Sequence, residues 1–509
     1  MSNAQDVANR GPITVSIMLA TIMNSLDMTI ANVALPHIQG SVSASVDQIT
    51  WVLTSYIVAA AIMTPLSGWL ADRFGRKRLF LISIAGFTVA SMFCGVANSL
   101  VEIVGYRLLQ GLFGASLIPL SQSLLLDINP PEKHGQAMAV WGAGAILGPI
   151  LGPALGGYLT EHLDWRWVFL INLPVGILAF AGVWFFVSHD SAKKTKPFDF
   201  LGFGALTLFI GATQMLLDRG PGLDWLYSFE IQCYLILAIV GLWVFITHTM
   251  TAAHPFFDRN LIRDRNFMTA CIFGFFIGIL LFSTMALIPP MMQHLLGYPV
   301  LTAGIVSMPR GVGSFVAMFV VGQLVGRIDT RLILLTGLIL SGYALWQMAQ
   351  FDLSMNQTPF IISGVIQGFG IGLIFVPLST LAFATVSPHL RSEGSAVYTL
   401  IRNLGSAVGI SIMQALVVSN TQAMHESLAG RMNLTDPVVQ SDLGSRIDLS
   451  SIAGLEAMNG EITRQATMVA YVDCFRLMLW VTIACIPMLL LMRKPKPSNQ
   501  PRAAHVEID

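Results

Sequence analysis

Two ionisable side chains stand inside apolar runs of the chain. Asp27 lies within Leu26 to Pro36, part of a run that opens near Pro12, and Arg107 lies in a later run. Placing an ionised Asp in hydrocarbon costs at least about 2.5 kcal/mol, so Asp27 needs a cation, a wet cavity or a proton. It either titrates protons or cations, or only pins helices as a buried carboxylate. Because acids are rare inside membranes, we favour the titrating role.

The depths of these two residues match. At 1.5 Å per residue, Asp27 lies about 21 Å from the start of its span, which leaves about 9 Å to the far face of a 30 Å core. Arg107, in a span that enters from that far face, lies about 10 Å deep. We therefore predict an ion pair that holds Asp27 ionised and whose separation lets a proton bind.

Composition makes this an integral membrane protein. Of 509 residues, 54% are hydrophobic and only 11% are charged, against about 25% charged in soluble domains. Spans need roughly 20 mostly apolar residues. We predict fourteen, at residues 13–35, 51–70, 79–97, 102–125, 136–158, 167–187, 200–217, 230–250, 267–289, 302–325, 332–350, 359–384, 396–419 and 469–492.

The distribution of Lys and Arg predicts the orientation. Cytoplasmic loops of membrane proteins carry an excess of these residues. With both termini in the cytoplasm, the short outside loops hold only Arg166 and Arg219, and the inside loops hold all of the larger clusters. No small-residue cleavage site follows the first apolar run, so we expect an uncleaved first span. The polar segment 420–468 then falls outside, where residues 456–470 have an amphipathic helical pattern.

An internal repeat divides the chain. Gln110-Gly111 with Pro119-Leu120-Ser121 returns as Gln367-Gly368 with Pro377-Leu378-Ser379, an offset of about 257 residues. Two related halves with a site between them are a transporter architecture. We predict a six-helix half at residues 1–190, a two-helix insert at 191–258, and a second six-helix half at 259–509 that includes the outside segment 420–468.

Several motifs together resemble those of a known family. They are Gly68-Trp69-Leu70-Ala71-Asp72-Arg73-Phe74-Gly75-Arg76-Lys77-Arg78, Arg107-Leu108-Leu109-Gln110-Gly111, the run from Gly148 to Gly157, Trp165-Arg166-Trp167, Asn172-Leu173-Pro174, and the run from Arg464 to Tyr471. The first resembles the loop between spans 2 and 3 of the major facilitator superfamily, and the others resemble its drug:proton antiporter branch. With fourteen spans, the chain resembles the EmrB/QacA family over nearly its whole length. This implies an all-α major facilitator fold.

The loop between spans 2 and 3 has features beyond its positive charge. Gly75 permits a tight turn, and Asp72 closes span 2 beside Arg73, Arg76 and Lys77. Such a cluster can form a salt-bridge latch that breaks when the halves rock, or it can serve only as a positive-inside loop. We favour the latch, because neither Gly68 nor Asp72 is needed for orientation.

Span 5 carries a glycine every fourth residue. The stripe at 144, 148, 152 and 156 allows close approach of another helix, and two prolines bend the span. Packing alone would explain such a stripe, whereas the family resemblance implies the antiporter helix and export. The residues of this helix that we single out are Gly148, Pro149, Gly152, Pro153 and Gly156.

Four further residues are assigned less specifically. Arg310 and Arg402 lie deep in later spans without an obvious carboxylate partner, so they either bind an anionic substrate group or satisfy backbone carbonyls. Gln110 and Asn32 lie on the spans of Arg107 and Asp27. We group all four as a substrate-binding or charge-relay set.

The prediction is a proton-driven exporter of amphipathic drugs in the bacterial inner membrane, working by alternating access. Export of a dedicated metabolite, siderophore or lipid stays open. The ten dispersed histidines do not suit a membrane-embedded enzyme, and a channel would not need a two-half repeat with a latch. Five scattered cysteines without C-x-x-C spacing predict no metal site, and we expect no cofactor and no nucleic acid. The resemblance implies a periplasmic adaptor and an outer-membrane channel as partners.

Overall fold

The computed structural model describes residues 10–130, 133–188, 197–325, 327–387, 390–431 and 451–491. Helices dominate these ranges. In the first half of the sequence they are α1 (Arg10–Ser41), α2 (Val46–Ile49), α3 (Trp51–Met63), α4 (Leu66–Phe74), α5 (Arg76–Val96), α6 (Leu100–Gly114), α7 (Leu117–Ile128), α8 (His134–His162), α9 (Trp167–Leu170) and α10 (Asn172–Phe186).

The remaining helices follow the same pattern. They are α11 (Phe200–Arg219), the 3₁₀ turns η2 (Gly220–Gly222) and η3 (Trp225–Tyr227), α12 (Phe229–Thr251), α13 (Arg259–Arg263), α14 (Arg265–His294), α15 (Val300–Leu324), α16 (Thr330–Met348), α17 (Thr358–Ala384), α18 (Arg391–Arg431), α20 (Ile452–Cys485) and η5 (Pro487–Leu491).

The predicted number of spans is confirmed. Within the described ranges, thirteen helical segments are long and apolar enough to cross a membrane, and α3 with α4 makes a fourteenth when this bent pair counts as one span. The two helices of the pair are inclined by 59°. Their break falls at Thr64 and Pro65, where the proline lacks the N–H that would continue the hydrogen-bond ladder. The sequence predicted one span there, at 51–70, without a bend being assigned.

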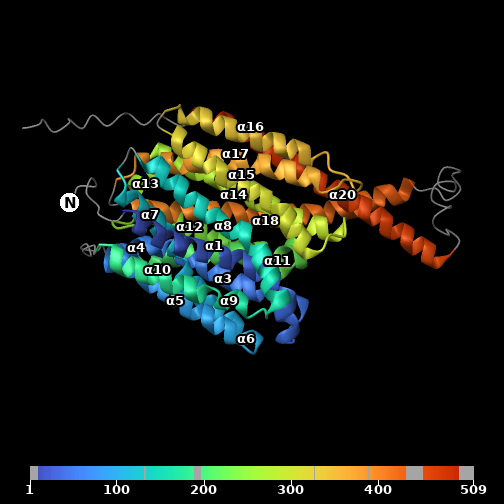
Figure 1. Cartoon of the computed structure of the whole chain (residues 1–509), viewed down its shortest axis with the longest axis horizontal. Helices are drawn as coiled ribbons and strands as arrows, with labels where there is room; N and C mark the ends of the chain where they lie inside the picture. Colours follow the sequence, from blue (N-terminus) through green and yellow to red (C-terminus); the bar gives the residue numbers. More distant parts are fainter. Residues whose placement is uncertain are drawn as a thin grey trace, which may run out of the picture.

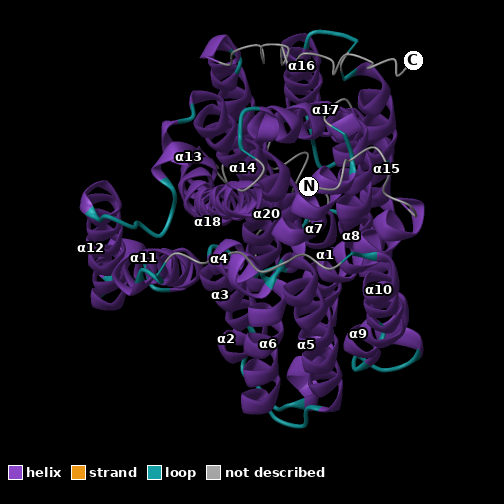
Figure 2. Cartoon of the chain, turned by 90° about the vertical axis from the view of Figure 1, so that its left-hand side faces the viewer, coloured by secondary structure: helices purple, strands orange, loops and turns teal. Residues whose placement is uncertain are grey.

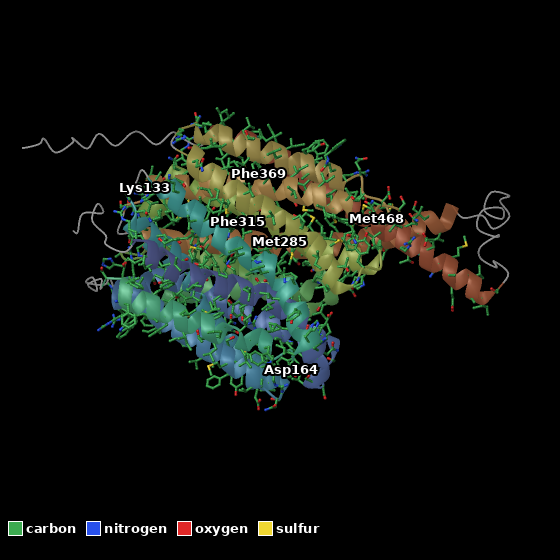
Figure 3. All side chains as sticks on the ribbon, in the orientation of Figure 1. Lys133, Asp164, Met285, Phe315, Phe369 and Met468 are labelled. Carbon is green, nitrogen blue, oxygen red and sulfur yellow. The ribbon has the colours of Figure 1, made fainter. Side chains whose placement is uncertain are left out.

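Two ends of the helix bundle are distinguished by charge. We call the end that carries the α4–α5 turn, Lys133 and the start of α18 the basic end. Figure 3 shows Lys133 there and Asp164 at the opposite end. Figure 1 shows that α18 and α20 project beyond the bundle at the end away from the basic one. The predicted outer helix at 456–470 is therefore the beginning of α20, and residues 432–450 of the predicted outer segment lie outside the described residues.

Two groups of helices form the body. Seen from the basic end in Figure 2, α1 to α10 lie in the lower group and α13 to α20 in the upper group, with α11 and α12 to one side. Helix α8 packs on α1 and also on α15, so it joins the groups. Helix α11 packs on both α3 and α18. This arrangement fits the predicted two halves and insert, whose division stays a prediction, and the boundary near 190 lies outside the described residues.

Candidate functional site

The buried carboxylate of Asp27 accepts hydrogen bonds from two other helices. Arg107 on α6 forms an ion pair with it, Nη1 to Oδ2, at 2.6 Å. Gln110 donates from Nε2 to Oδ1 at 2.8 Å, and Asn172 on α10 donates from Nδ2 to the same oxygen at 3.0 Å. Asp27 has no solvent exposure and Arg107 only 1%. The contact expected from the matching depths is present, and three helices meet at one carboxylate.

Arg107 has several other partners. Its Nε donates to the carbonyl oxygen of Val52 on α3 at 3.1 Å, and Nη1 also donates to Oε1 of Gln110 at 2.8 Å. The guanidinium carbon lies 4.3 Å from the ring centroid of Tyr56 and 5.7 Å from that of Phe169. A buried cation needs several such contacts to offset its lost hydration. Arg107 therefore stays held in place even without the carboxylate.

Further polar side chains around this pair were not predicted. Asn172 also donates to the hydroxyl of Ser91 at 2.9 Å, and Tyr56 donates to the side-chain carbonyl of Asn24 at 2.7 Å. Asn24 precedes Asp27 by three residues, a spacing that puts both on one helix face, so this signal was in the sequence. Asn32 is exposed, and no hydrogen bond within the described residues joins it to Asp27. Gln110, in contrast, belongs to the Asp27 site.

The glycine stripe of α8 holds α1 beside this site. A Cβ added at Gly148 would collide with backbone atoms of Ser25 and Leu26, and one at Gly152 would collide with Thr29. The Thr29 hydroxyl donates to the Gly148 carbonyl at 3.2 Å. The stripe therefore fixes α1 within two residues of Asp27.

The opposite face of the same helix contacts the second half. A Cβ at Gly304 of α15 would lie 3.5 Å from Cβ of Pro153. Pro149 and Pro153 lie within α8, and Gly156 packs on Ile30 of α1. Helix α8 thus passes between α1 and α15, a position from which it can transmit a movement of one half to the other.

At the basic end, the predicted latch loop is a tight turn. Gly75 has φ of 85°, a conformation that glycine adopts without strain. Arg73 lies over the Trp69 ring at 5.3 Å, and Lys77 donates to the carbonyl of Trp184 at 2.8 Å. Arg76 forms an ion pair with Asp127, at the end of α7. Asp127 was not predicted as part of this cluster: it lies two residues beyond the predicted span 102–125, and hydropathy does not show which helix it faces.

Contacts from α4 and α7 to α18 join the halves at this end. Asp127 also accepts a hydrogen bond from Arg391 at 3.1 Å. The hydroxyls of Ser123 and Ser392 are 3.0 Å apart, and Ser395 donates to Gln122 at 2.6 Å.

Gly68 occupies the closest approach of α4 to α18. A Cβ added there would lie 2.9 Å from Cα of Glu393, closer than real side chains come. Any larger residue at position 68 would push α4 away from α18. The basic end is closed in this structure.

The two arginines of the second half differ from one another. Arg310 is buried and donates from Nη2 to the carbonyl of Leu281 and to the hydroxyl of Thr284, both at 3.1 Å. Arg402 lies 5.6 Å from the ring centroid of Phe375, and its Nε is buried without a hydrogen-bond partner. Arg310 thus satisfies a backbone carbonyl, one of its two predicted roles, whereas no such bond of Arg402 is found among the described residues.

One carboxylate on the insert was also missed. Asp218 accepts a hydrogen bond from Gln214 on the same helix at 2.9 Å, and one from Thr54 on α3. It lies one residue beyond the predicted span 200–217, which is why the search for intramembrane charges passed over it. In the described part of the chain, no three His, Cys, Asp or Glu side chains gather in a way that would hold a metal ion.

Comparison with known proteins decides the family. The sequence profile of the Major Facilitator Superfamily matches residues 17–410. The chain belongs to the major facilitator superfamily. It is 35% identical to the "Multidrug export protein EmrB" of Haemophilus influenzae over 433 residues, 84% of each chain. It is 33% identical to the "Fatty acid resistance protein FarB" of Neisseria gonorrhoeae, over 95% of this chain and 96% of the relative.

A solved structure supports the fold of this major facilitator independently. The proton:xylose symporter XylE, bound to 6-bromo-6-deoxy-D-glucose, has a TM-score of 0.59. It shares 11% identity and covers 95% of this chain and 98% of its own. At that identity the likeness concerns the fold alone. Together with the apolar helices, the EmrB relatives identify a multi-pass protein of the bacterial inner membrane.

Proposed function

We propose that this protein is a multidrug efflux transporter that exports amphipathic compounds in exchange for protons, by alternating access. Its membership of the major facilitator superfamily and its EmrB-type relatives support the efflux activity. The observation that carries the proton step is the fully buried pair of Asp27 and Arg107. An acid at this depth is stable as an anion only while the guanidinium and the two amides face it.

Protonation would release the helices that meet at Asp27. A neutral carboxylic acid loses its attraction to Arg107 and accepts hydrogen bonds from Gln110 and Asn172 more weakly. Arg107 keeps the Val52 carbonyl and the Tyr56 ring, so it stays on α3 and α6. Helix α1 is then free to move relative to α6 and α10. This couples proton binding to helix position without any cofactor.

Alternating access would use the basic end as one gate. The positive-inside rule puts that end and both termini in the cytoplasm. The contacts from Asp127, Ser123 and Gly68 to α18 then close the cytoplasmic side. We propose that the loop from Gly68 to Lys77 is a conformational latch that favours the outward-open form, with Asp127 as the carboxylate that links its Arg76 to the second half.

Two points about substrates and partners extend this proposal. Because one relative is named a fatty acid resistance protein, export of a lipid is an alternative to export of drugs. Export of a dedicated metabolite or a siderophore is another alternative. The ends of α18 and α20 project from the bundle on the side that we assign to the periplasm. We propose them as the contact for a periplasmic adaptor protein, which would lead to an outer-membrane channel.

Transport of a dye in everted vesicles tests the function. We expect ethidium to accumulate when respiration acidifies the vesicle lumen, so that protons leave the lumen as ethidium enters, and we expect the accumulation to collapse when a weak base removes the pH difference. Vesicles with Asp27→Asn, expressed at the same level, are the matched control and should give the background rate. Accumulation by the wild type that ignores the pH difference would refute proton coupling. Transport of fatty acids but of no drug would favour the lipid alternative.

A further inference from the structure

In addition to Arg107 and Arg310, a third arginine, Arg402, lies at mid-depth in the bundle, on α18. Arg402 follows the first residue of that helix, Arg391, by about 17 Å at 1.5 Å per residue, roughly half of a 30 Å core. Its side chain is partly exposed, although α18 packs against α14, α20, α7 and α11. A charge at this depth is costly wherever it lacks a counter-charge or a set of acceptors.

Within the described residues, Arg402 lacks the acceptors that the other deep arginines have. Arg107 pairs with a carboxylate at 2.6 Å, and Arg310 donates to a carbonyl and a hydroxyl at 3.1 Å. The structure gives the guanidinium of Arg402 a ring contact instead, and its Nε–H is buried without an acceptor. A buried donor without a partner destabilises the protein, because it has lost its hydrogen bond to water. Such a group is suited to an acceptor that is not part of this chain.

The wall beside Arg402 is aromatic and is built from both halves. Arg402 lies over Phe375 of α17 at 5.6 Å. Phe375 in turn stacks on Trp141 of α8, with ring centroids 5.7 Å apart and planes inclined by 11°. Trp141 is fully buried and fixed by a hydrogen bond from its Nε1 to the Ser121 hydroxyl at 2.8 Å. Phe375 therefore meets the other half through Trp141, and Arg402, which lies against Phe375, is close to the interface between the halves.

We propose that Arg402 and Phe375 form a binding site for the anionic head group of an aromatic amphipath, a carboxylate or sulfonate attached to a flat ring. The planar guanidinium matches such a head group with two parallel hydrogen bonds. Phe375, against which the guanidinium lies, offers an aromatic contact to the attached ring. This inference rests on the proposed export function and adds the chemistry of the substrate. Because the wall includes Trp141 of the first half, binding there senses how the two halves are placed.

Binding of a matched pair of probes tests the site. The probes are 2-naphthoate and the (2-naphthylmethyl)trimethylammonium cation, titrated calorimetrically into the purified full-length protein in lipid nanodiscs. Arg402→Gln should weaken binding of the anion roughly 10- to 100-fold, the range for a hydrogen bond to a charged group. It should leave binding of the cation unchanged. Arg402→Lys, which keeps the charge without the planar fork, should lose about 3- to 10-fold.

Two further variants keep the test decisive. Phe375→Leu, which does not alter a charge, should weaken binding of 2-naphthoate several-fold but leave binding of acetate unchanged. Arg310→Gln is the matched control, a buried arginine whose Nη2 already donates to Leu281 and Thr284, and it should change the affinity for 2-naphthoate by less than about threefold. Equal affinity for 2-naphthoate in the wild type and in Arg402→Gln, or no binding to the wild type, would overturn the inference.

Chloride is the other source of a negative charge. The titration is therefore repeated with chloride in place of gluconate in the buffer. If chloride weakens binding of 2-naphthoate in the wild type but not in Arg402→Gln, chloride and 2-naphthoate share the Arg402 site, as the proposal expects. Chloride binding that Arg402→Gln abolishes while 2-naphthoate binding persists would mean an inorganic anion site and would refute the proposal. Ethidium transport driven by a pH difference distinguishes a failure of the proposed export function from a failure of the proposed Arg402 site. Its absence from the wild type refutes the export function, whereas equal binding of 2-naphthoate by wild type and Arg402→Gln refutes this site alone.

Discussion

The repeat places two polar sites at equivalent positions, and they differ in charge. The offset of 257 residues that relates Gln110 to Gln367 also relates Asp27 to Thr284. Both glutamines use Nε2 in the same way: Gln110 donates to Asp27 at 2.8 Å, and Gln367 donates to the Thr284 hydroxyl at 3.2 Å. The second half therefore keeps the hydrogen bond between the two helices and replaces the acid with a hydroxyl.

The arginine beside this position also comes from a different helix in each half. Arg107 on α6 corresponds to Gly364 on α17, and the space beside that glycine is taken by Arg310 from the neighbouring helix α15, with Cβ atoms 3.5 Å apart if Gly364 had one. Arg310 lies 3.1 Å from Thr284. Only the first half has a group that can exchange a proton at this position. We propose that the duplicated scaffold carries a titrating site in the first half, whereas the equivalent place in the second half has Arg310 and Thr284 but no acid.

The largest expected effect comes from removing the acid. Asp27→Asn keeps the shape but cannot titrate, so transport driven by a pH difference should fall to the rate of protein-free liposomes. The protein should still insert and fold, since Arg107 keeps the Val52 carbonyl and two aromatic rings. The measurement is dye uptake into proteoliposomes with a matched Thr284→Val variant. Wild-type rates in Asp27→Asn would sink the coupling role.

A double-mutant cycle measures whether Asp27 and Arg107 act as a pair. Arg107→Ala should cost about 3 to 5 kcal/mol of stability, because it leaves a buried carboxylate unpaired. In the Asp27→Asn background the same change should cost at least about 1 kcal/mol less. Thermal unfolding in detergent gives the four values. The corresponding cycle of Arg310→Ala with Thr284→Val should show weaker coupling, since no charge pair is broken. Additive losses for Asp27 and Arg107 would contradict the pairing.

Depth along a helix could be predicted from the sequence, whereas direction around it could not. The matching depths of Asp27 and Arg107 follow from residue counts and the helical rise alone. Other contacts depend on how each helix is rotated about its own axis in the bundle. Examples are the contact of Asn172 with Asp27 and the contacts of Asp127 with Arg76 and Arg391. Hydropathy does not specify that rotation when most faces are apolar. For the same reason, Arg310 and Arg402 looked alike in the sequence.

Helix ends outside the apolar runs were predicted only in part. Helix α18 (Arg391–Arg431) runs on beyond the predicted span 396–419, whereas the part of α20 (Ile452–Cys485) that precedes the predicted span 469–492 includes the predicted helix at 456–470. Nothing in polar composition alone stops a helix, because capping residues and glycine or proline do that. The polar flanks of these spans contain good helix formers, so the helices continue.

The latch at the basic end should have a smaller, conformational effect. Asp127→Asn removes the carboxylate shared by Arg76 and Arg391 while the positive loop stays intact. Topology should be unchanged, and the equilibrium should shift toward the inward-open form by about 1.4 kcal/mol, or about tenfold in populations. Labelling of engineered cysteines at the cytoplasmic ends of α4 and α18 reports the shift, and Asp72→Asn tests the carboxylate of the loop itself. Equal labelling in wild type and both variants would leave the loop with an orienting role only.

The smallest effect distinguishes the two equivalent glutamines. Gln110 bonds to two charged groups, donating to Asp27 and accepting from Arg107, so Gln110→Leu should cost about 2 to 3 kcal/mol of stability and slow proton-driven transport. Gln367 donates only to a neutral hydroxyl, and its Oε1 is buried without a partner. Gln367→Leu removes that unsatisfied acceptor together with one neutral hydrogen bond, so it should change stability by less than about 1 kcal/mol. The Thr284 hydroxyl keeps Arg310 as a donor and the Leu280 carbonyl as an acceptor in that variant.

Unfolding midpoints and dye transport of the two leucine variants give the comparison. Equal losses of stability and transport in both leucine variants would mean that the second half carries a functional site equivalent to the first. The difference between an acid at position 27 and a hydroxyl at position 284 would then have no bearing on transport.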